Sequence, residues 1–317
     1  METHKNQLQG YLAAAGTLAI WSAFILFSRL AGKSALSGYD VLALRVGTAS
    51  LLLLPFLRDI PRVVWRDARL WTLAMLGGLL YGLLVYTGFK YAPAAHGAIL
   101  LPGVQPLLIT LMGWLLNRAR PTAARVVGLA GITLGVSLAA VPYFAGGSGF
   151  HSLPGDLLIL GASLVWALYS LLVKRWAFDP WVLTRAVAIL PALVFLPVYF
   201  LFLPQHLAEV PTATLVTQAL YQGIGPTIVA MLLFLRAISL LGTERTAAVI
   251  ALVPVVSGLA AAPLLGEALS PWLVGGLFFV TLGAWFAARP QPAGKTSPTS
   301  VEVPAAPQNR CIRTDIA

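Results

Sequence analysis

The strongest constraint on the fold is a series of apolar stretches, each close to the roughly 20 residues that cross a bilayer as a helix. They recur along the whole chain, and their short connections leave no room for a soluble domain. Only 10% of the 317 residues are charged, whereas soluble domains have about 25%. The sequence therefore predicts an all-α integral membrane protein with ten transmembrane helices, at residues 8–30, 40–58, 70–90, 94–116, 124–142, 155–175, 181–203, 213–237, 243–266 and 269–288.

The basic residues predict how these helices are oriented. Sixteen of the 21 lysines and arginines fall in alternate connections and the tail, at 5, 58–69, 118–125, 174–175, 236–245 and 289–313. Such an excess is typical of cytoplasmic loops, and we expect both termini in the cytoplasm of a multi-pass protein of the cell inner membrane. The net charge of +10 is thus explained by topology, and we expect no nucleic acid as a partner.

The two ends of the chain differ in character. The first apolar helix is expected to be retained, because no small-residue cleavage site follows it and nine further spans do. Residues 289–317 are rich in Pro, Ser and Thr, and we expect a disordered cytoplasmic tail there. The single cysteine, Cys311, lies in that tail, so the sequence excludes a disulfide within the chain.

The two halves of the sequence repeat one another. A shift of 148 residues brings Pro106 onto Pro254, Gly128 onto Gly276 and the run Thr-Leu-Gly at 133–135 onto the same run at 281–283. Slightly different shifts align Trp21 with Trp166 and Arg45 with Arg185. We expect two five-helix repeats, at 8–142 and 155–288. Because five is odd, the second repeat enters the membrane from the opposite side, which is the architecture of alternating-access transporters.

Four segments carry a family resemblance. They are GDLLILGASLVWALYSLLVKRWA (155–177), LVPVVSGLAAAPLLGEALSPWLVGGLFFVTLGA (252–284), AIWSAFILFSRL near the start and VLALRVG in the second helix. In this order and spacing, the chain resembles the EamA repeat of the drug/metabolite transporter superfamily over residues 8–288. One departure is that the family's Gly-Glu pair, present as Gly266 and Glu267, is replaced in the first repeat, where Ala119 stands in the position of the glutamate.

The resemblance implies a secondary transporter of small organic metabolites, with amino acids or their derivatives as substrates and export as the direction. The residues add exclusions. No GxxxxGK[ST] pattern for ATP binding and no HExxH or GxSxG motif occurs. We therefore expect neither enzymatic activity nor a cofactor or metal, and the expected partners are a small-molecule substrate and the lipid bilayer.

The stretch HGAILLPGVQP (96–106) predicts where a substrate is held. Gln105 is roughly 16 Å from each end of its span, near the bilayer midplane, where an amide needs a partner in protein or water. Pro102 and Pro106 each remove a backbone donor and disturb the carbonyl about one turn earlier. We expect this segment to line an interior cavity. A glutamine that only joins two helices remains the alternative.

Aromatic and polar side chains at helical spacing supply further candidates for the cavity wall, on faces within 17–28, 163–170 and 218–225. Such walls suit a small amphipathic organic ligand better than an inorganic ion. The predicted substrate-binding residues are Gln105, Trp21, Trp166, Tyr169, Tyr221, Gln222 and, more weakly, Tyr81.

Four residues are candidates for gating or coupling: His96, Arg45, Pro102 and Pro106. Histidine as a residue type titrates near neutrality, which suits a proton carrier, but His96 lies near the outer end of its helix, on the face opposite Gln105. Arg45 is interpreted first as a structural or topological anchor that reaches the interface by snorkelling, with anion binding as the alternative. The glycines at 131, 135, 276 and 283 fit either helix packing within the chain or a homodimer.

Three other readings stay open. A nucleotide-sugar or sugar-phosphate carrier of the same superfamily needs deep basic residues, and only Arg45 and Arg185 come close. A membrane-embedded enzyme acting on lipid needs a catalytic dyad or metal cluster at one depth, which four dispersed histidines do not supply. A scaffold or receptor without transport activity is opposed by the inverted repeat alone.

Overall fold

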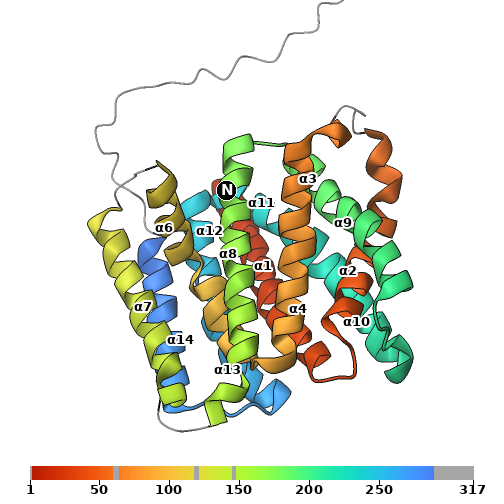
Figure 1. Cartoon of the computed structure of the whole chain (residues 1–317). Coiled ribbons are helices and arrows are strands. Elements are labelled where there is room, and N and C mark those ends of the chain that lie inside the picture. Colours follow the sequence, from red (N-terminus) through yellow and green to blue (C-terminus); the bar gives the residue numbers. More distant parts are fainter. Residues whose placement is uncertain (1, 60–63, 118–120, 145–147, 289–317) are drawn as a thin grey trace, which may run out of the picture.

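The computed structural model describes residues 2–59, 64–117, 121–144 and 148–288, and this part of the chain is a bundle of helices (Figure 1). The predicted tail and Ala119 lie outside the described residues. In the first half the helices are α1 (Glu2–Gly32), α2 (Gly38–Leu53), α3 (Ala68–Ala74), α4 (Tyr81–Tyr91), α5 (Ala94–Ala98), α6 (Gln105–Asn117) and α7 (Ala123–Phe144). In the second half they are α8 (Leu153–Trp176), α9 (Pro180–Phe202), α10 (Thr212–Ile224), α11 (Ala230–Leu241), α12 (Thr243–Ile250), α13 (Val253–Leu265) and α14 (Pro271–Ala287).

Nine helical segments of the described chain are long and apolar enough to cross a bilayer. They coincide with the first nine predicted spans, from Asn6–Gly32 to Arg245–Leu265. The tenth predicted span is α14, an apolar helix of 17 residues, shorter than the roughly 20 that span a bilayer without thinning it. The all-helical membrane class is therefore confirmed. The count of ten spans, the inverted repeat and the cytoplasmic termini stay predictions.

Several bilayer-length segments change their winding near the middle. The segment from α3 to α4 passes through a π-helical turn, η3 (Met75–Leu80), and that from α5 to α6 through η4 (Ile99–Gly103). A third, η7 (Gly225–Val229), joins α10 to α11. Pro102 lies within η4 and Pro226 within η7, and proline is a usual cause of such breaks. Broken helices free backbone groups at mid-depth, where a transporter holds its ligand.

Local sequence sets where the helices begin and end. Ser37 and Asp40 form a capping box at the start of α2. Asp179 and Ser270 cap α9 and α14, each followed by a proline in the first turn. At the end of α13, Gly266 adopts φ +65°, a left-handed conformation that a side chain disfavours.

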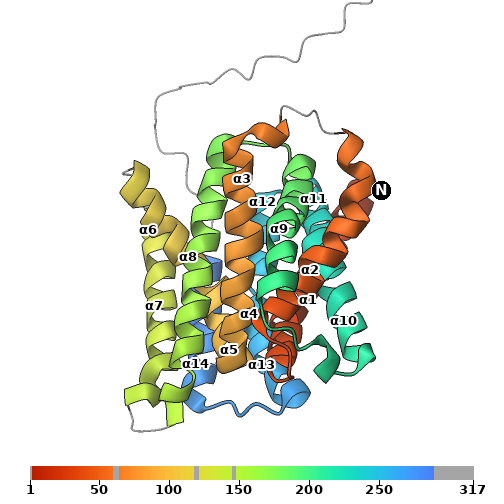
Figure 2. The ribbon, with the colours of Figure 1, turned by 45° about the vertical axis from the view of Figure 1, so that its right-hand side comes forward.

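Helices α7 and α14 run antiparallel and pack through small residues. Figure 2 shows α7 beside α14 at one flank, and the close approach of this pair comes from glycines. A Cβ added at Gly128 would lie 2.6 Å from the Gly283 carbonyl oxygen, and one at Gly135 would lie 2.6 Å from that of Gly276. Glycines at these positions let two backbones meet within the membrane. The glycine faces are thus used for packing inside the chain, and the homodimer stays a prediction.

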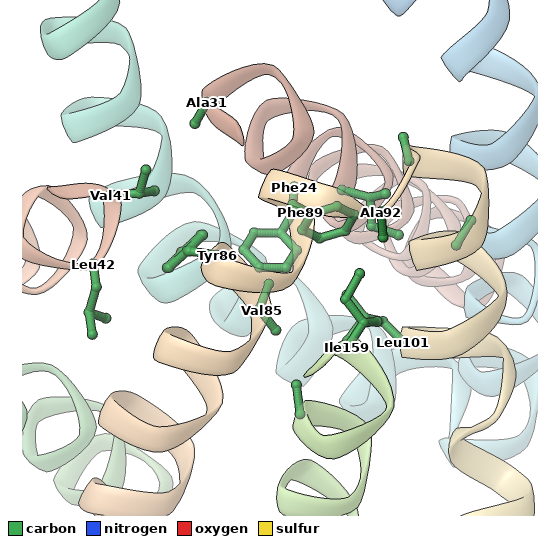
Figure 3. Packing of buried hydrophobic residues seen from close by; sticks show 14 of the residues in the cluster. Phe24, Ala31, Val41, Leu42, Val85, Tyr86, Phe89, Ala92, Leu101 and Ile159 are labelled. Carbon is green, nitrogen blue, oxygen red and sulfur yellow. The ribbon is translucent and has the colours of Figure 1, made fainter. Parts of the chain in front are cut away.

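The largest core cluster lies between α1, α2, α4, α8 and the segment α5–η4. Figure 3 shows Phe24 of α1 beside Tyr86 and Phe89 of α4, with Ile159 of α8 and Leu101 of η4 nearby. Phe24 and Tyr86 meet edge to face with ring centroids 6.1 Å apart. This cluster holds together the helices that also form the cavity described next.

Candidate functional site

A cavity of about 280 Å³ lies among the helices near the middle of the bundle. Elements from both predicted repeats contribute to it, including α1, α2, α4, η4 and α6 from the first and α8, η7, α11, α12 and α13 from the second. Its wall consists of Trp21, Phe24, Ile25, Arg45, Tyr81, Leu101, Pro102, Gln105, Ile109, Trp166, Pro226, Met231, Ile250 and Val253. Mostly apolar walls with a few polar groups are typical of sites for small organic ligands.

Three predicted aromatic residues, Trp21, Tyr81 and Trp166, line this cavity. The rings of Tyr81 and Trp166 lie 4.8 Å apart, and Trp21 packs on Phe234 at 5.2 Å. Tyr169 supports Trp166 from behind at 5.0 Å and does not itself line the cavity. The aromatic side chains are therefore held by neighbouring rings, so they offer a pre-ordered apolar surface to a ligand.

Gln105 lies in the cavity wall and also joins two helices, so both interpretations of this residue hold in part. Its Nε2 donates to the carbonyl of Ser163 at 3.2 Å, and Ser163 Oγ donates to the carbonyl of Leu100 at 2.5 Å. The latter carbonyl belongs to the π-helical turn that contains Pro102. Among the described residues, Gln105 Oε1 has no hydrogen-bond donor, which leaves an acceptor beside the cavity.

The structure corrects the interpretation of Arg45 as an anchor at the interface. The side chain is only 9% exposed and lines the cavity. Its Nη1 donates to Tyr86 Oη at 3.0 Å, and the guanidinium carbon lies 5.9 Å from the centre of the Phe24 ring. The contacts with Tyr86 and Phe24 hold the arginine inside the bundle, so it does not snorkel toward the interface.

Two other predicted site residues lie away from the cavity wall. Gln222 accepts from Tyr86 Oη at 3.1 Å and donates to Ser28 Oγ and Gln218 Oε1, both at 3.3 Å. Tyr221 donates to the carbonyl of Ile20 at 2.6 Å and stacks on Phe27. Their polar groups are already satisfied, so in this conformation they join α10 to α1 and α4. A role for either residue in binding stays a prediction.

Charged residues gather where α1, α4 and α13 end, at the lower end of the bundle in Figures 1 and 2. Arg29 and Glu267 form an ion pair at 2.6 Å, and Arg29 also donates to the carbonyl of Phe89 at 2.8 Å. The other oxygen of Glu267 accepts from the backbone N–H of Ala94 at 2.7 Å, at the start of α5. Glu267 thus ties the end of α13 to α1 and α5, and Arg29 adds the contact with α4.

His96 belongs to a second polar cluster at the same end. Its Nδ1 lies 3.0 Å from Asp156 Oδ2, and Tyr143 donates to the same carboxylate. The cluster joins α5, α7 and α8, and none of these three residues lines the cavity. Pro106, in the first turn of α6, also lies outside the lining. A coupling or gating role for His96 and Pro106 stays a prediction.

Sequence reasoning missed two residues that shape the cavity. Pro226 lines it at a π-helical turn, and a proline in the middle of a 30-residue apolar segment is the signal that would have found it. Tyr86 holds Arg45, but its position on α4 bears no pattern that sets it apart from a core tyrosine. Among the described residues, no cluster of His, Cys, Asp and Glu side chains could hold a metal ion.

Bilayer-length apolar helices around a central cavity define a multi-pass membrane protein with an interior cavity. The chain belongs to the EamA-like transporter family, which matches residues 8–141 and 153–289.

Curated relatives and a solved structure agree with this assignment. Over 189 residues the chain is 25% identical to "Uncharacterized transporter YyaM" of Bacillus subtilis (strain 168), a match that covers 58% of this chain and 61% of YyaM. It is 28% identical over 206 residues to "Uncharacterized transporter YvbV" of the same organism, and this match covers 64% of this chain and 65% of YvbV. The matches thus span less than two thirds of either relative. One crystal structure, 25% identical, superposes with a TM-score of 0.58 over 88% of this chain and 96% of the solved one.

Proposed function

We propose that this protein is a secondary transporter that exports small organic metabolites, such as amino acids or their derivatives, across the inner membrane by alternating access. The central cavity carries this proposal, because it combines aromatic walls with an amide near mid-membrane depth. Its volume of about 280 Å³ lies just below the roughly 300–1,000 Å³ of drug-sized sites. Trp21, Tyr81 and Trp166 bury the apolar part of the substrate, and Gln105 accepts a hydrogen bond from a polar group.

The packing of α7 on α14 supports an inverted repeat. Gly128 meets Gly283 and Gly135 meets Gly276. In the alignment at a shift of 148 residues, Gly128 corresponds to Gly276 and Gly135 corresponds to Gly283, so the two contacts are equivalent. Contacts that map onto one another in this way are expected for two halves related by a two-fold axis, the arrangement used for alternating access.

In the proposed transport cycle, the ion pair between Arg29 and Glu267 holds one end of the helix bundle closed. By the distribution of basic residues, the lower end of the bundle faces outward. In the proposed cycle, the contacts of Glu267 with α1 and α5 keep the outer end closed while the cavity exchanges substrate with the cytoplasm. Export then requires these contacts to break and re-form in each cycle. The export direction itself rests on the family resemblance.

The rival functions fit the site less well. A nucleotide sugar carries several negative charges, and among the described lining residues Arg45 is the one basic side chain. A lipid-modifying enzyme needs a nucleophile with a base or a metal site, and the part of the cavity wall that the structure describes contains no His, Cys, Asp or Glu. A scaffold that transports nothing would need neither a mid-membrane cavity nor an ion pair that closes the outer end of the bundle.

Counterflow in liposomes tests the proposal. The purified full-length chain is reconstituted and given a labelled panel of amino acids, purines and sugars, beside a Gln105→Leu/Trp166→Ala double variant. We expect uptake of amino acids that falls at least about tenfold in the double variant, with unchanged helicity by circular dichroism. Equal flux in both proteins would remove the cavity from the transport route. No flux of any panel member, from folded protein, would contradict the proposed function.

A further inference from the structure

Arg45 is a buried charge without a described counter-ion. Among the residues that the structure describes, no carboxylate lies within ion-pair distance of its guanidinium, whereas Arg29 and Arg69 each have one. Its hydrogen-bond partner is the neutral hydroxyl of Tyr86. Charged groups within a membrane protein normally pair with one another or face a water-filled cavity, and Arg45 faces the cavity.

The hydrogen bonds around Arg45 run in one direction. Arg45 donates to Tyr86, Tyr86 donates to Gln222, and Gln222 donates to Gln218, which in turn donates to the carbonyl of Phe27. Every residue in this series of hydrogen bonds is neutral except the arginine. These hydrogen bonds therefore orient the guanidinium and leave its charge uncompensated. Since a buried charge is costly without an opposite charge, the cavity favours an anionic group from a ligand.

We infer that Arg45 is a substrate-binding residue that takes the single carboxylate of a small organic substrate, while Trp21, Tyr81 and Trp166 contact its apolar part. The inference rests on the proposed function and narrows its substrate class. A guanidinium matches a carboxylate through paired hydrogen bonds, and one arginine balances one negative charge. Cationic compounds and polyphosphates are thereby disfavoured.

Arg185 provides a matched comparison within the same chain. It aligns with Arg45 between the two halves of the sequence, but it is absent from the cavity wall. Arg185 donates to the carbonyl of Phe56 at 3.0 Å and lies over the ring of Trp181. Substitution of Arg185 thus removes the same type of side chain from the equivalent helix without touching the cavity.

The experiment compares each carboxylate with its own amide. Purified full-length protein in detergent is titrated with N-acetyl-leucine, N-acetyl-phenylalanine and benzoate, and with the primary amide of each, with binding followed by thermal shift and equilibrium dialysis. The proteins are the unchanged chain and its Arg45→Gln, Arg45→Lys and Arg185→Gln variants. The same ligands are then used for counterflow in liposomes.

We expect at least one carboxylate to bind the unchanged chain about 10- to 100-fold more tightly than its amide, the range for a charged hydrogen bond. Arg45→Gln abolishes that preference, Arg45→Lys retains part of it, and Arg185→Gln leaves it intact. The inference is overturned if carboxylate and amide bind equally to the unchanged chain, if Arg45→Gln keeps the preference, or if no member of the panel binds. Should Arg45→Gln fail to fold, the Arg45→Lys result and the comparison of ligands on the unchanged chain still decide.

The two parts of the experiment separate this inference from the proposed function. Carboxylate binding that depends on Arg45, without counterflow, would support the anion site and contradict transport. Equal counterflow of carboxylates and amides would support transport and overturn the anion site.

Discussion

Two polar regions of this protein differ in how their charges are satisfied. At the lower end of the bundle, Glu267 has both Arg29 and a backbone N–H as partners, and Asp156 has His96 and Tyr143. In the cavity, Arg45 has one neutral partner and Gln105 Oε1 has no described donor. The groups at the lower end therefore hold helices together, whereas those in the cavity retain hydrogen-bonding capacity for a ligand.

The difference follows from what surrounds each group. The lower end joins helix ends, where backbone N–H groups and side chains from several segments converge. In the cavity the helices are broken by Pro102 and Pro226 and do not close around the polar groups. Substitutions at the lower end are thus expected to act mainly on stability, and substitutions in the cavity mainly on transport.

Breaking the ion pair at the lower end has the largest expected effect. Replacing Glu267 by alanine leaves Arg29 without its carboxylate at a site where both side chains are largely buried. We expect a loss of about 3 kcal/mol in the free energy of unfolding, measured by thermal unfolding in detergent. The exposed pair of Arg69 with Asp67 is the control, and Arg69→Gln should leave Tm unchanged. Equal Tm values for the Glu267 and Arg69 variants would remove the distinction between the two pairs.

Gln222 tests a paired amide beside the cavity. Gln222→Leu removes the acceptor of the Tyr86 hydroxyl and the donor to Gln218 Oε1, and we expect a loss of about 2 kcal/mol in unfolding free energy. The same series of hydrogen bonds orients Arg45 through Tyr86, so transport should fall as well. A variant that keeps the wild-type Tm would show that the hydrogen bonds of Gln222 do not contribute to stability.

Trp166 tests the apolar wall of the cavity. Trp166→Ala removes a ring that packs between Tyr81 and Tyr169, and we expect a weakening of substrate binding by about 1.5 kcal/mol, slightly more than tenfold. Trp114, which is 48% exposed on α6 and absent from the cavity wall, is the matched control. If Trp114→Ala lowers counterflow as much as Trp166→Ala, the aromatic wall is not the binding surface.

Gln105 tests the unpaired amide and has the smallest expected effect. Gln105→Leu removes one hydrogen bond to a substrate, which corresponds to about 1 kcal/mol or roughly fivefold in transport rate. Membrane abundance and Tm should change less than in Gln222→Leu, because Gln105 makes a single described hydrogen bond. A Tm that falls as far as in Gln222→Leu, with transport unchanged, would make Gln105 a purely structural residue.

Several features of the cavity were predictable from sequence because they depend on local pattern. Trp21, Trp166 and Gln105 were found by their depth in apolar spans, and Pro102 by its effect on the backbone around it. Tyr169, Tyr221 and Gln222 have the same local features, but they pack against other side chains and do not line the cavity. Helical spacing identifies which residues share a face, while the packing of other helices decides whether that face meets a cavity.

The sequence alone determined the membrane class, the family and nine bilayer-length helices, because hydropathy and helix ends depend on residues close together in the chain. Only the tertiary structure decided the different settings of Arg45 and Arg185. Both are arginines near the start of equivalent helices, but Tyr86 and Gln222 hold the first in the cavity, while Phe56 and Trp181 contact the second outside it. The physical reason is that the cost of a buried charge depends on partners that are distant in sequence.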